Sequence, residues 1–204
     1  GVEGDEKLTP EILDLRKRQA KNFCALLFVS AGTPMFLAGD EFLQTQGGNN
    51  NPFNQDNETS WLDWRRLEQF PDVFRFFREM IAFRKAHPTF CRSRFWRSDI
   101  AWHGVGRHVD LSHESRSLAW CLQGKSESDS KLYVMANMYT DDLEFTIQEG
   151  RGSSWVRIVD TALPSPDDIV LEGRPVPRKK IVVRSRSVVI LASREKERDA
   201  EPHA

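Results

Sequence analysis

The N-terminal part of the chain places apolar residues at the spacing of two helices. Thr9 followed by Pro10 is typical of a helix start, because threonine caps free backbone N–H groups and proline suits the first turn. Apolar residues then recur on one helical face, and residues 23–29 are apolar nearly all round, which predicts burial on several sides. A second apolar run predicts a helix that starts at residues 70–72 and stops at residues 87–88, where proline follows histidine.

A short apolar run, residues 34–38, lies between the predicted helices and leads into a long polar loop. The run predicts a buried strand, and helix, strand, long loop and helix in that order are typical of an α/β barrel. The loop, residues 38–64, is rich in amides, carboxylates and glycines and closes on Trp61 and Trp64. Its aromatic content argues against disorder, and long ordered loops are usually functional. Amides and carboxylates beside aromatic faces are groups that hold sugars.

The hydrophobic period changes in the C-terminal half of the chain. Short segments rich in β-branched and aromatic residues are separated by Gly, Ser, Asp or Pro, and they predict strands. The segments are residues 117–123, 131–139, 143–148, 154–159 and 180–192. Together they predict an all-β domain built as an antiparallel sandwich. Its core is expected to contain Trp96, Trp102, Trp120 and Trp155.

Composition and charge exclude several classes of partner. A formal net charge of −1 over 204 residues argues against general attraction to nucleic acid or to an anionic membrane. The sequence contains no apolar run long enough to span a bilayer. Three cysteines, an odd number, predict a reduced and therefore cytoplasmic compartment. His103, His108 and His113 lack the spacing and acidic partners of a zinc site, so we expect them at the surface and expect no metal or cofactor.

Three parts of the sequence carry longer motifs. They are residues 32–42 (GTPMFLAGDEF), residues 48–64 (GNNNPFNQDNETSWLDW), and residues 157–168 with 186–189 in the β half. Together they resemble the C-terminal part of isoamylase-type glycogen and starch debranching enzymes, in glycoside hydrolase family 13 of the α-amylase superfamily. The resemblance covers about residues 1–192. Leu43-Gln44 departs from the pattern, because many relatives carry glycine and a basic residue there.

The resemblance implies an α+β fold with two domains. Residues 1–92 correspond to the last helix–strand–helix elements of a (β/α)8 TIM barrel, namely helix seven, strand eight and helix eight. Residues 93–193 correspond to the all-β antiparallel sandwich that follows the barrel. A charged tail, residues 194–204, lacks periodicity and is expected to be disordered.

The resemblance also implies which chemistry this chain lacks. The family cleaves by a retaining mechanism that uses an aspartate nucleophile, a glutamate acid/base and a second aspartate, held at the ends of the fourth, fifth and seventh barrel strands. Those strands precede the segments that this chain matches, and none of its acids aligns with the three residues. We therefore expect no catalytic residue here, and we expect the chain by itself to be inactive.

Seven residues of the loop are candidates for substrate binding. They are Asp40, Glu41, Asn49, Asn50, Asn51, Asp56 and Trp61. Asp40 and Glu41 are adjacent at a predicted strand end, so one is expected to face the cleft while the other caps or pairs with a neighbouring loop. The asparagines and the aspartate could bind sugar hydroxyls or hold the loop through side chain–backbone turns. Trp61 could be a sugar platform or, with Trp64 three residues away, part of the core.

Two functions remain open from the sequence. The first is the C-terminal part of a debranching glycoside hydrolase that acts on α-1,6-glucosidic branch points of glycogen or amylopectin, in which this chain supplies a cleft loop and the β-domain. The alternative is a self-standing, non-catalytic module that binds α-glucan or assembles subunits. Expected partners are branched α-glucan and either the remainder of the barrel or a second copy of the chain, docking through residues 23–38. No nucleic acid or membrane partner is expected.

Overall fold

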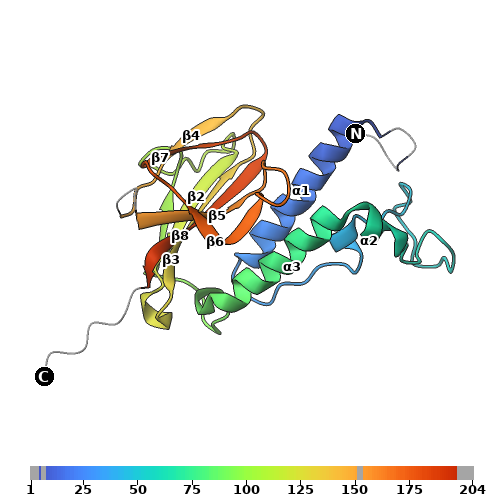
Figure 1. Cartoon of the computed structure of the whole chain (residues 1–204), viewed down its shortest axis with the longest axis horizontal. Coiled ribbons are helices and arrows are strands. Elements are labelled where there is room, and N and C mark those ends of the chain that lie inside the picture. The colour runs from blue at the N-terminus through green and yellow to red at the C-terminus, as the bar shows by residue number, and fades with distance from the viewer. Residues whose placement is uncertain (1–4, 6–7, 151–153, 197–204) are drawn as a thin grey trace, which may run out of the picture.

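The computed structural model describes residue 5, residues 8–150 and residues 154–196. Within these residues a β-sandwich lies beside two long helices, and a loop extends from the helices away from the strands (Figure 1). The helices are α1 (Pro10–Phe28), α2 (Arg65–Gln69) and α3 (Pro71–Ala86), with short 3-10 turns η1 (Asp40–Phe42), η2 (Pro88–Phe90) and η3 (Lys125–Glu127).

Helix α1 begins where the sequence predicts but buries a different face. Thr9 caps it by accepting a hydrogen bond of 3.4 Å from the backbone N–H of Ile12, and Pro10 occupies the first turn. The buried residues, polar as well as apolar, are Lys21, Asn22, Cys24, Ala25 and Phe28. Phe23 is 73% exposed, so the prediction that residues 23–29 are buried on several sides is wrong for this side chain. The reason is that α1 contacts the sheet on one side and α3 on another, which leaves a third side uncovered.

Helix α3 starts and stops at the predicted positions and holds the end of α1. Pro71 occupies its first turn, and it ends at Ala86 before the predicted stop. Arg84, in the last turn, is buried and donates four hydrogen bonds to backbone carbonyls. The acceptors are Phe28 (2.6 Å), Ser30 (2.9 Å), Gly32 (2.6 Å) and Phe90 (2.7 Å). These bonds satisfy carbonyls that the end of a helix leaves free, and a cation suits the negative end of the α1 dipole.

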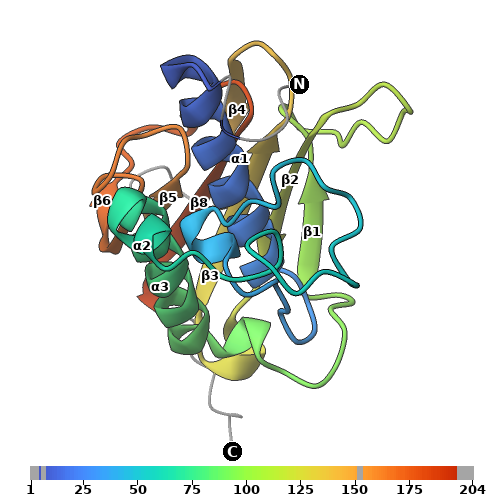
Figure 2. The same ribbon diagram turned by 90° about the vertical axis from the view of Figure 1, so that its right-hand side faces the viewer.

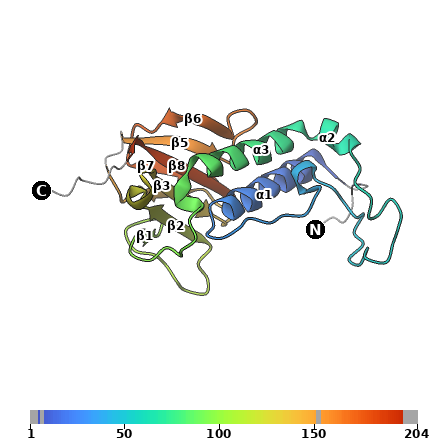
Figure 3. The same ribbon diagram turned by 90° about the horizontal axis from the view of Figure 1, so that it is seen from below.

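All strand pairings among the described residues are antiparallel, which confirms that part of the sandwich prediction. A six-stranded sheet has the order β1-β2-β3-β8-β5-β6, and a two-stranded sheet pairs β4 with β7. The strands are β1 (Ile100–His103), β2 (Ser117–Leu122), β3 (Ser130–Asn137), β4 (Leu143–Thr146), β5 (Trp155–Asp160), β6 (Ile169–Pro175), β7 (Lys180–Val183) and β8 (Ser187–Lys196). Figures 2 and 3 show α1 and α3 side by side across one face of the larger sheet.

The predicted strand at residues 34–38 is absent. This segment runs from α1 to η1 without pairing with any strand in the part of the chain that the structure describes. A strand needs the N–H and C=O groups of a neighbouring strand, and neither sheet reaches this segment. The helix–strand–helix expectation for the N-terminal region therefore holds only for its two helices.

The β half also differs from the prediction at its end. The single strand expected at residues 180–192 is divided into β7 and β8, which belong to different sheets. Arg186 has a φ of 50°, in the left-handed region, and its N–H donates to the carbonyl of Tyr139 at 3.1 Å, so the chain turns there. The sequence predicts a disordered tail from residue 194, but strand β8 continues to Lys196, so residues 194–196 belong to the strand. Residues 197–204 lie outside the described part.

Two hydrophobic cores lie on opposite faces of the larger sheet. The core between this sheet and the helices includes Phe28, Phe76 and Trp120, and the core between the two sheets includes Tyr133, Phe145 and Trp155. Of the four tryptophans expected in the core, Trp120 and Trp155 are buried and Trp96 packs at the edge of the first core, but Trp102 is 53% exposed. His103 is not a surface residue, because its ring stacks on Tyr133 at 5.6 Å between centroids.

A buried group of charges joins the helices to the sandwich. The carboxylate of Asp168, which is fully buried just before β6, pairs with Lys21 of α1 at 2.7 Å and with Arg75 of α3. Lys21 also lies 3.5 Å from Asp72 and over the ring of Phe76. Removing one partner of such a group leaves the others as uncompensated charges in a low-dielectric interior. Lys21, Asp72, Arg75 and Asp168 together form the Asp168 network.

Asp168→Asn is expected to destabilise the protein strongly. Breaking a buried ion pair on one side costs roughly 3–5 kcal/mol. Here Arg75 loses its carboxylate partner, and Lys21 keeps only Asp72, at 3.5 Å. Urea unfolding monitored by tryptophan fluorescence measures the change. The matched control is the neighbour Asp167→Asn, whose side chain is 56% exposed and which should change stability by less than about 0.5 kcal/mol. Equal losses in the two variants would contradict a structural role for the network.

The ion pair between Arg92 and Asp99 should make stability depend on acid pH. The guanidinium of Arg92 lowers the pKa of Asp99 to about 2, whereas the unfolded value is about 3.9. Because the pKa of Asp99 is lower in the folded than in the unfolded state, its ionised carboxylate stabilises the folded protein above about pH 4. This stabilisation is lost as the pH falls toward about 2. Asp99→Asn should therefore lower the free energy of unfolding at pH 7, and that free energy should fall less between about pH 4 and about pH 2 than it does in the wild type. Urea unfolding at several pH values measures both effects. Asp141→Asn, at an exposed turn, should retain the wild-type profile.

Candidate functional site

The 38–64 loop begins with a tight turn in which both candidate carboxylates bind backbone. Asp40 accepts a hydrogen bond of 3.0 Å from the N–H of Leu37, and Glu41 accepts one of 2.8 Å from the N–H of Gly39. Burial raises the pKa of Asp40, and the nearby charge of Glu41 adds to this effect. Both side chains therefore have a local role in the turn, whereas the sequence predicted such a role for only one of them.

Gln44 joins the start of the 38–64 loop to its end through hydrogen bonds. Its side-chain amide donates to the carbonyl of Trp61 at 2.8 Å, and its side-chain oxygen accepts from the N–H of Asp63 at 3.0 Å. A side chain at Gly39 would place its Cβ only 2.6 Å from the Cβ of Gln44, so only glycine fits beneath this contact. Arg66 of α2 adds a bond of 2.8 Å to the carbonyl of Leu43. The loop is thus closed at its base by the side chains of Gln44 and Arg66.

The three candidate asparagines divide between holding the loop and facing solvent. Asn49 accepts a hydrogen bond of 2.9 Å from the N–H of Asn51, which is a local turn. Asn50 and Asn51 are exposed, and their side chains make no hydrogen bond within the residues that the structure describes. Loop-holding therefore accounts for Asn49, and only the other two present free amides.

Trp61 and Asp56 form the part of the loop best suited to bind a sugar. The indole N–H of Trp61 donates to the carboxylate of Asp56 at 2.8 Å, and 56% of this tryptophan remains exposed. The hydrogen bond fixes the ring in place, so little side-chain entropy is lost when a ligand packs against it. Trp64 is 63% exposed, and its ring also contacts buried Phe42 at 5.4 Å between centroids. Both tryptophans are exposed, so the alternative that they belong to the core is wrong.

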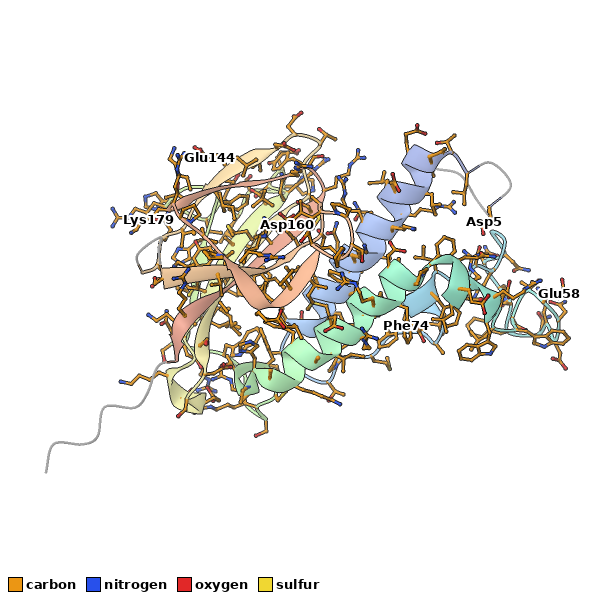
Figure 4. All side chains as sticks on the ribbon, in the orientation of Figure 1. Asp5, Glu58, Phe74, Glu144, Asp160 and Lys179 are labelled. Carbon is orange, nitrogen blue, oxygen red and sulfur yellow. The ribbon has the colours of Figure 1, made fainter. Side chains whose placement is uncertain are left out.

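A polar hollow of about 370 Å³ lies beside Trp61. Its lining residues are Gln44, Thr45, Glu58, Trp61, Leu62, Asp63, Arg65 and Arg66. Asp63 makes two contacts with Arg65, at 2.8 and 3.0 Å, and this hydrogen bonding lowers the pKa of Asp63 and raises that of Arg65. Figure 4 shows Glu58 at the tip of the molecule, on the loop that contains this hollow. Amide, hydroxyl, carboxylate and guanidinium groups are thus available around one aromatic face.

The structure brings together only part of the predicted set. Asp56 and Trp61 are in contact, whereas Asp40 and Glu41 belong to the turn at the opposite end of the loop. The sequence reasoning missed Gln44, Thr45 and Arg65. Gln44 departs from the family pattern, but no local signal in the sequence indicates that it contacts Trp61, seventeen residues later.

An apolar groove of about 530 Å³ runs along the uncovered side of α1. Its lining residues are Ala20, Phe23, Cys24, Leu27, Met35, Phe36, Leu37, Asp40, Leu43, Gln44 and Phe77. Met35 is 86% exposed and Leu37 is 64% exposed, so large apolar side chains face solvent there. Such a contiguous patch usually marks an interaction surface. Among the described helices, none combines the length and apolar character needed to cross a membrane.

Comparisons with known proteins agree with this architecture. The family described as isoamylase, C-terminal, matches residues 104–192. The chain is 38% identical to isoamylase 3, chloroplastic, from rice over 197 residues, which are 95% of this chain and 25% of that protein. It is 35% identical to a glycogen operon protein GlgX homolog of Mycobacterium tuberculosis over 193 residues, 82% of this chain and 27% of that protein. The chain thus spans about a quarter of the length of these relatives.

Solved structures give the same picture of the fold. The pullulanase from Bacillus acidopullulyticus superimposes with a TM-score of 0.67 at 24% identity, covering 93% of this chain and 22% of that one. A variant of the pullulanase from Paenibacillus barengoltzii, solved in complex with maltotetraose, gives 0.64 at 26% identity, covering 92% and 26%. The shared fold includes the β-sandwich that carries the isoamylase C-terminal match. The chain belongs to the isoamylase-type debranching enzymes of glycoside hydrolase family 13, as a C-terminal portion of such a protein.

Proposed function

We propose that this chain forms the C-terminal part of an enzyme that cleaves α-1,6 branch points of glycogen or amylopectin, and that its 38–64 loop binds the glucan. The observation that carries the proposal is Trp61, whose exposed ring is fixed by Asp56 beside a polar hollow. A sugar ring packs its C–H face on an aromatic plane while its hydroxyls bind amides and carboxylates. A pullulanase of similar fold has been solved with maltotetraose, which supports the same ligand class here.

Within this proposal each loop residue has a specific role. Trp61 is the platform, and Asp56 is a positioning residue because its carboxylate is already bound to the indole N–H. Asn50 and Asn51 offer amides to sugar hydroxyls, whereas Asn49, Asp40 and Glu41 keep the backbone in the shape that presents the platform. The hydrolytic carboxylates belong to another part of the enzyme. Binding of the branched substrate, and not bond cleavage, is the contribution of this chain.

The apolar groove along α1 is the surface on which we place the remainder of the barrel. Residues 34–38 have no strand partner among the described residues, and the groove beside them exposes Phe23, Met35 and Leu37. A neighbouring barrel strand would pair with this segment and cover the apolar side chains, which removes both unfavourable features. Residues 1–92 would then complete the barrel, and residues 93–193 would form its terminal sandwich. A cytoplasmic location remains a prediction.

Trp61→Ala should weaken binding of maltotetraose roughly tenfold, because it removes an aromatic platform worth roughly 0.5–1.5 kcal/mol beyond its buried area. Isothermal titration calorimetry with the isolated chain measures the affinity. Trp102→Ala is the matched control, since Trp102 is a comparably exposed tryptophan (53%) on the sandwich. Unchanged affinity in Trp61→Ala, or an equal loss in Trp102→Ala, would contradict the assignment of the site.

The isolated chain should release no reducing sugar from amylopectin or pullulan. Both carboxylates at the start of the loop are engaged with backbone N–H groups, so they do not form the facing pair that glycoside hydrolysis requires. A reducing-sugar assay, with a complete isoamylase as positive control, checks this result. Debranching by the chain alone would overturn the assignment of catalysis to another part of the enzyme.

The isolated chain should self-associate through the α1 groove. The double variant Phe23→Glu/Leu37→Glu places charges among the exposed apolar side chains and should shift the chain to monomer, because a charge is costly to bury in an apolar contact. Sedimentation velocity over a range of concentrations measures the change. The control Phe53→Glu alters an apolar residue that is 95% exposed and lies outside the groove. A wild-type monomer at all concentrations would refute association through the groove.

A further inference from the structure

A third hollow, of about 260 Å³, is surrounded by cations. Arg157 of β5, Arg174 of β6, Arg178 of the β6–β7 connection and Lys180 at the start of β7 all line it. The remaining lining is apolar: Pro175, Val176, Pro177 and Ile181. Figure 4 shows Lys179, which lies between two of these cations in the sequence, at the opposite end of the molecule from Glu58 of the loop. This hollow (the basic pocket) is therefore separate from the 38–64 loop.

Carboxylates neutralise these cations only weakly. Among the described residues that line the basic pocket, none is acidic. Three of the cations reach a carboxylate outside the pocket, in the pairs Arg157–Asp160 (3.5 Å), Arg174–Asp167 (3.6 Å) and Lys180–Glu144 (2.6 Å). The first two distances exceed those of charge-assisted hydrogen bonds, and the third pair is more than half exposed on both sides. Arg178 forms no ion pair within the described part of the chain.

The strand register places two of the arginines directly opposite each other. Arg157 and Arg174 are partners across β5 and β6, and both side chains reach the basic pocket. Like charges directly opposite on neighbouring strands destabilise a sheet. An overall charge of −1 shows that a general excess of basic residues does not explain the pair. An anion between the two guanidinium groups would convert the repulsion into two attractive contacts.

We propose that the basic pocket binds a phosphorylated sugar. Guanidinium groups match the geometry of phosphate oxygens and bind them in a bidentate manner. The apolar side chains of Pro175, Pro177 and Ile181 provide a surface for the C–H face of the attached sugar. A single-stranded nucleic acid is a poorer fit, since the lining contains no aromatic residue on which a base could stack. The phosphate ester is either on a free sugar or on the α-glucan, and the second source rests on the proposed function.

The first test compares glucose 6-phosphate with glucose by isothermal titration calorimetry at low salt. The chain should bind the phosphorylated sugar, and Arg174→Gln should weaken that binding about tenfold, because one of the charge-assisted contacts is lost. Arg178→Lys, which keeps the charge but not the fork of donors, should weaken it less. The control Lys85→Ala removes a positive charge from an exposed position of α3 and should have no effect. Equal binding of glucose and glucose 6-phosphate, or an unaffected Arg174→Gln, overturns the proposal.

A stability measurement tests the like-charge pair without relying on calorimetric affinity. Glucose 6-phosphate should raise the Tm of the wild-type chain, because a ligand that binds only the folded state stabilises it. Arg174→Gln should unfold at the wild-type Tm or above it without ligand, since the repulsion is gone, and should show little increase when the ligand is added. A lower Tm for Arg174→Gln, or a ligand-induced rise equal to that of the wild type, contradicts the proposal.

A final comparison separates the two sources of phosphate. In affinity electrophoresis, phosphorylated amylopectin should retard the wild-type chain more than the same polymer after phosphatase treatment, and Arg174→Gln should abolish that difference. Trp61→Ala should reduce retention by both polymers, so failure of the loop site and failure of the basic pocket give different patterns. Retardation by glucan independent of phosphate, with glucose 6-phosphate still bound, assigns the pocket to free sugar phosphates. Heparin binding tenfold tighter than glucose 6-phosphate would identify a general polyanion surface and overturn the proposal.

Discussion

The pairing of Asp168 with Lys21 and Arg75 is the interaction on which the rest of this structure depends. A fully buried carboxylate is tolerated only when cations neutralise it, so α1, α3 and the segment before β6 must all be in place around it. Asn22 of α1 adds two hydrogen bonds: its side-chain oxygen accepts from the hydroxyl of Thr161 at 2.5 Å, and its side-chain amide donates to the carbonyl of Arg186 at 2.8 Å. The helices and the sandwich are therefore fixed to each other by directional polar contacts as well as by a shared hydrophobic core. Apolar packing alone would permit sliding, whereas these contacts allow one arrangement.

This fixed arrangement leaves the remaining sides of the helix pair uncovered. Arg84 binds the carbonyls of Phe28, at the end of α1, and of Gly32, just before residues 34–38. Gln44 then joins the two ends of the loop that contains Trp61. One side of α1 contacts the sheet, another contacts α3, and a third bears the apolar groove. The polar loop extends beyond the helices, away from the sandwich (Figure 1). An apolar surface and a polar surface thus lie next to each other.

The sandwich carries a third kind of surface at its far end. The basic pocket combines arginines from β5, from β6 and from the β6–β7 connection, and it exists because the register of β5 and β6 places Arg157 opposite Arg174. Apolar, polar and cationic surfaces are therefore distributed over separate parts of one chain with almost no net charge. Local charge and shape, and not the overall composition, decide which ligands such a chain can bind.

The sequence by itself determined the elements whose causes are local. Thr9-Pro10 and Pro71 start helices through capping and a fixed φ, and short segments rich in β-branched and aromatic residues specify strands such as β2 and β3, so these features were predicted correctly. The sequence motifs also identified the family and placed Trp61 and Asp56 in one loop. Tertiary structure alone decided the rest, because it depends on residues distant in the chain. It left residues 34–38 without a strand partner, exposed Phe23, buried Lys21 against Asp168, brought Gln44 to Trp61 and set Arg157 opposite Arg174. A local pattern records what one segment prefers, but burial, charge pairing and strand register are properties of two segments in contact.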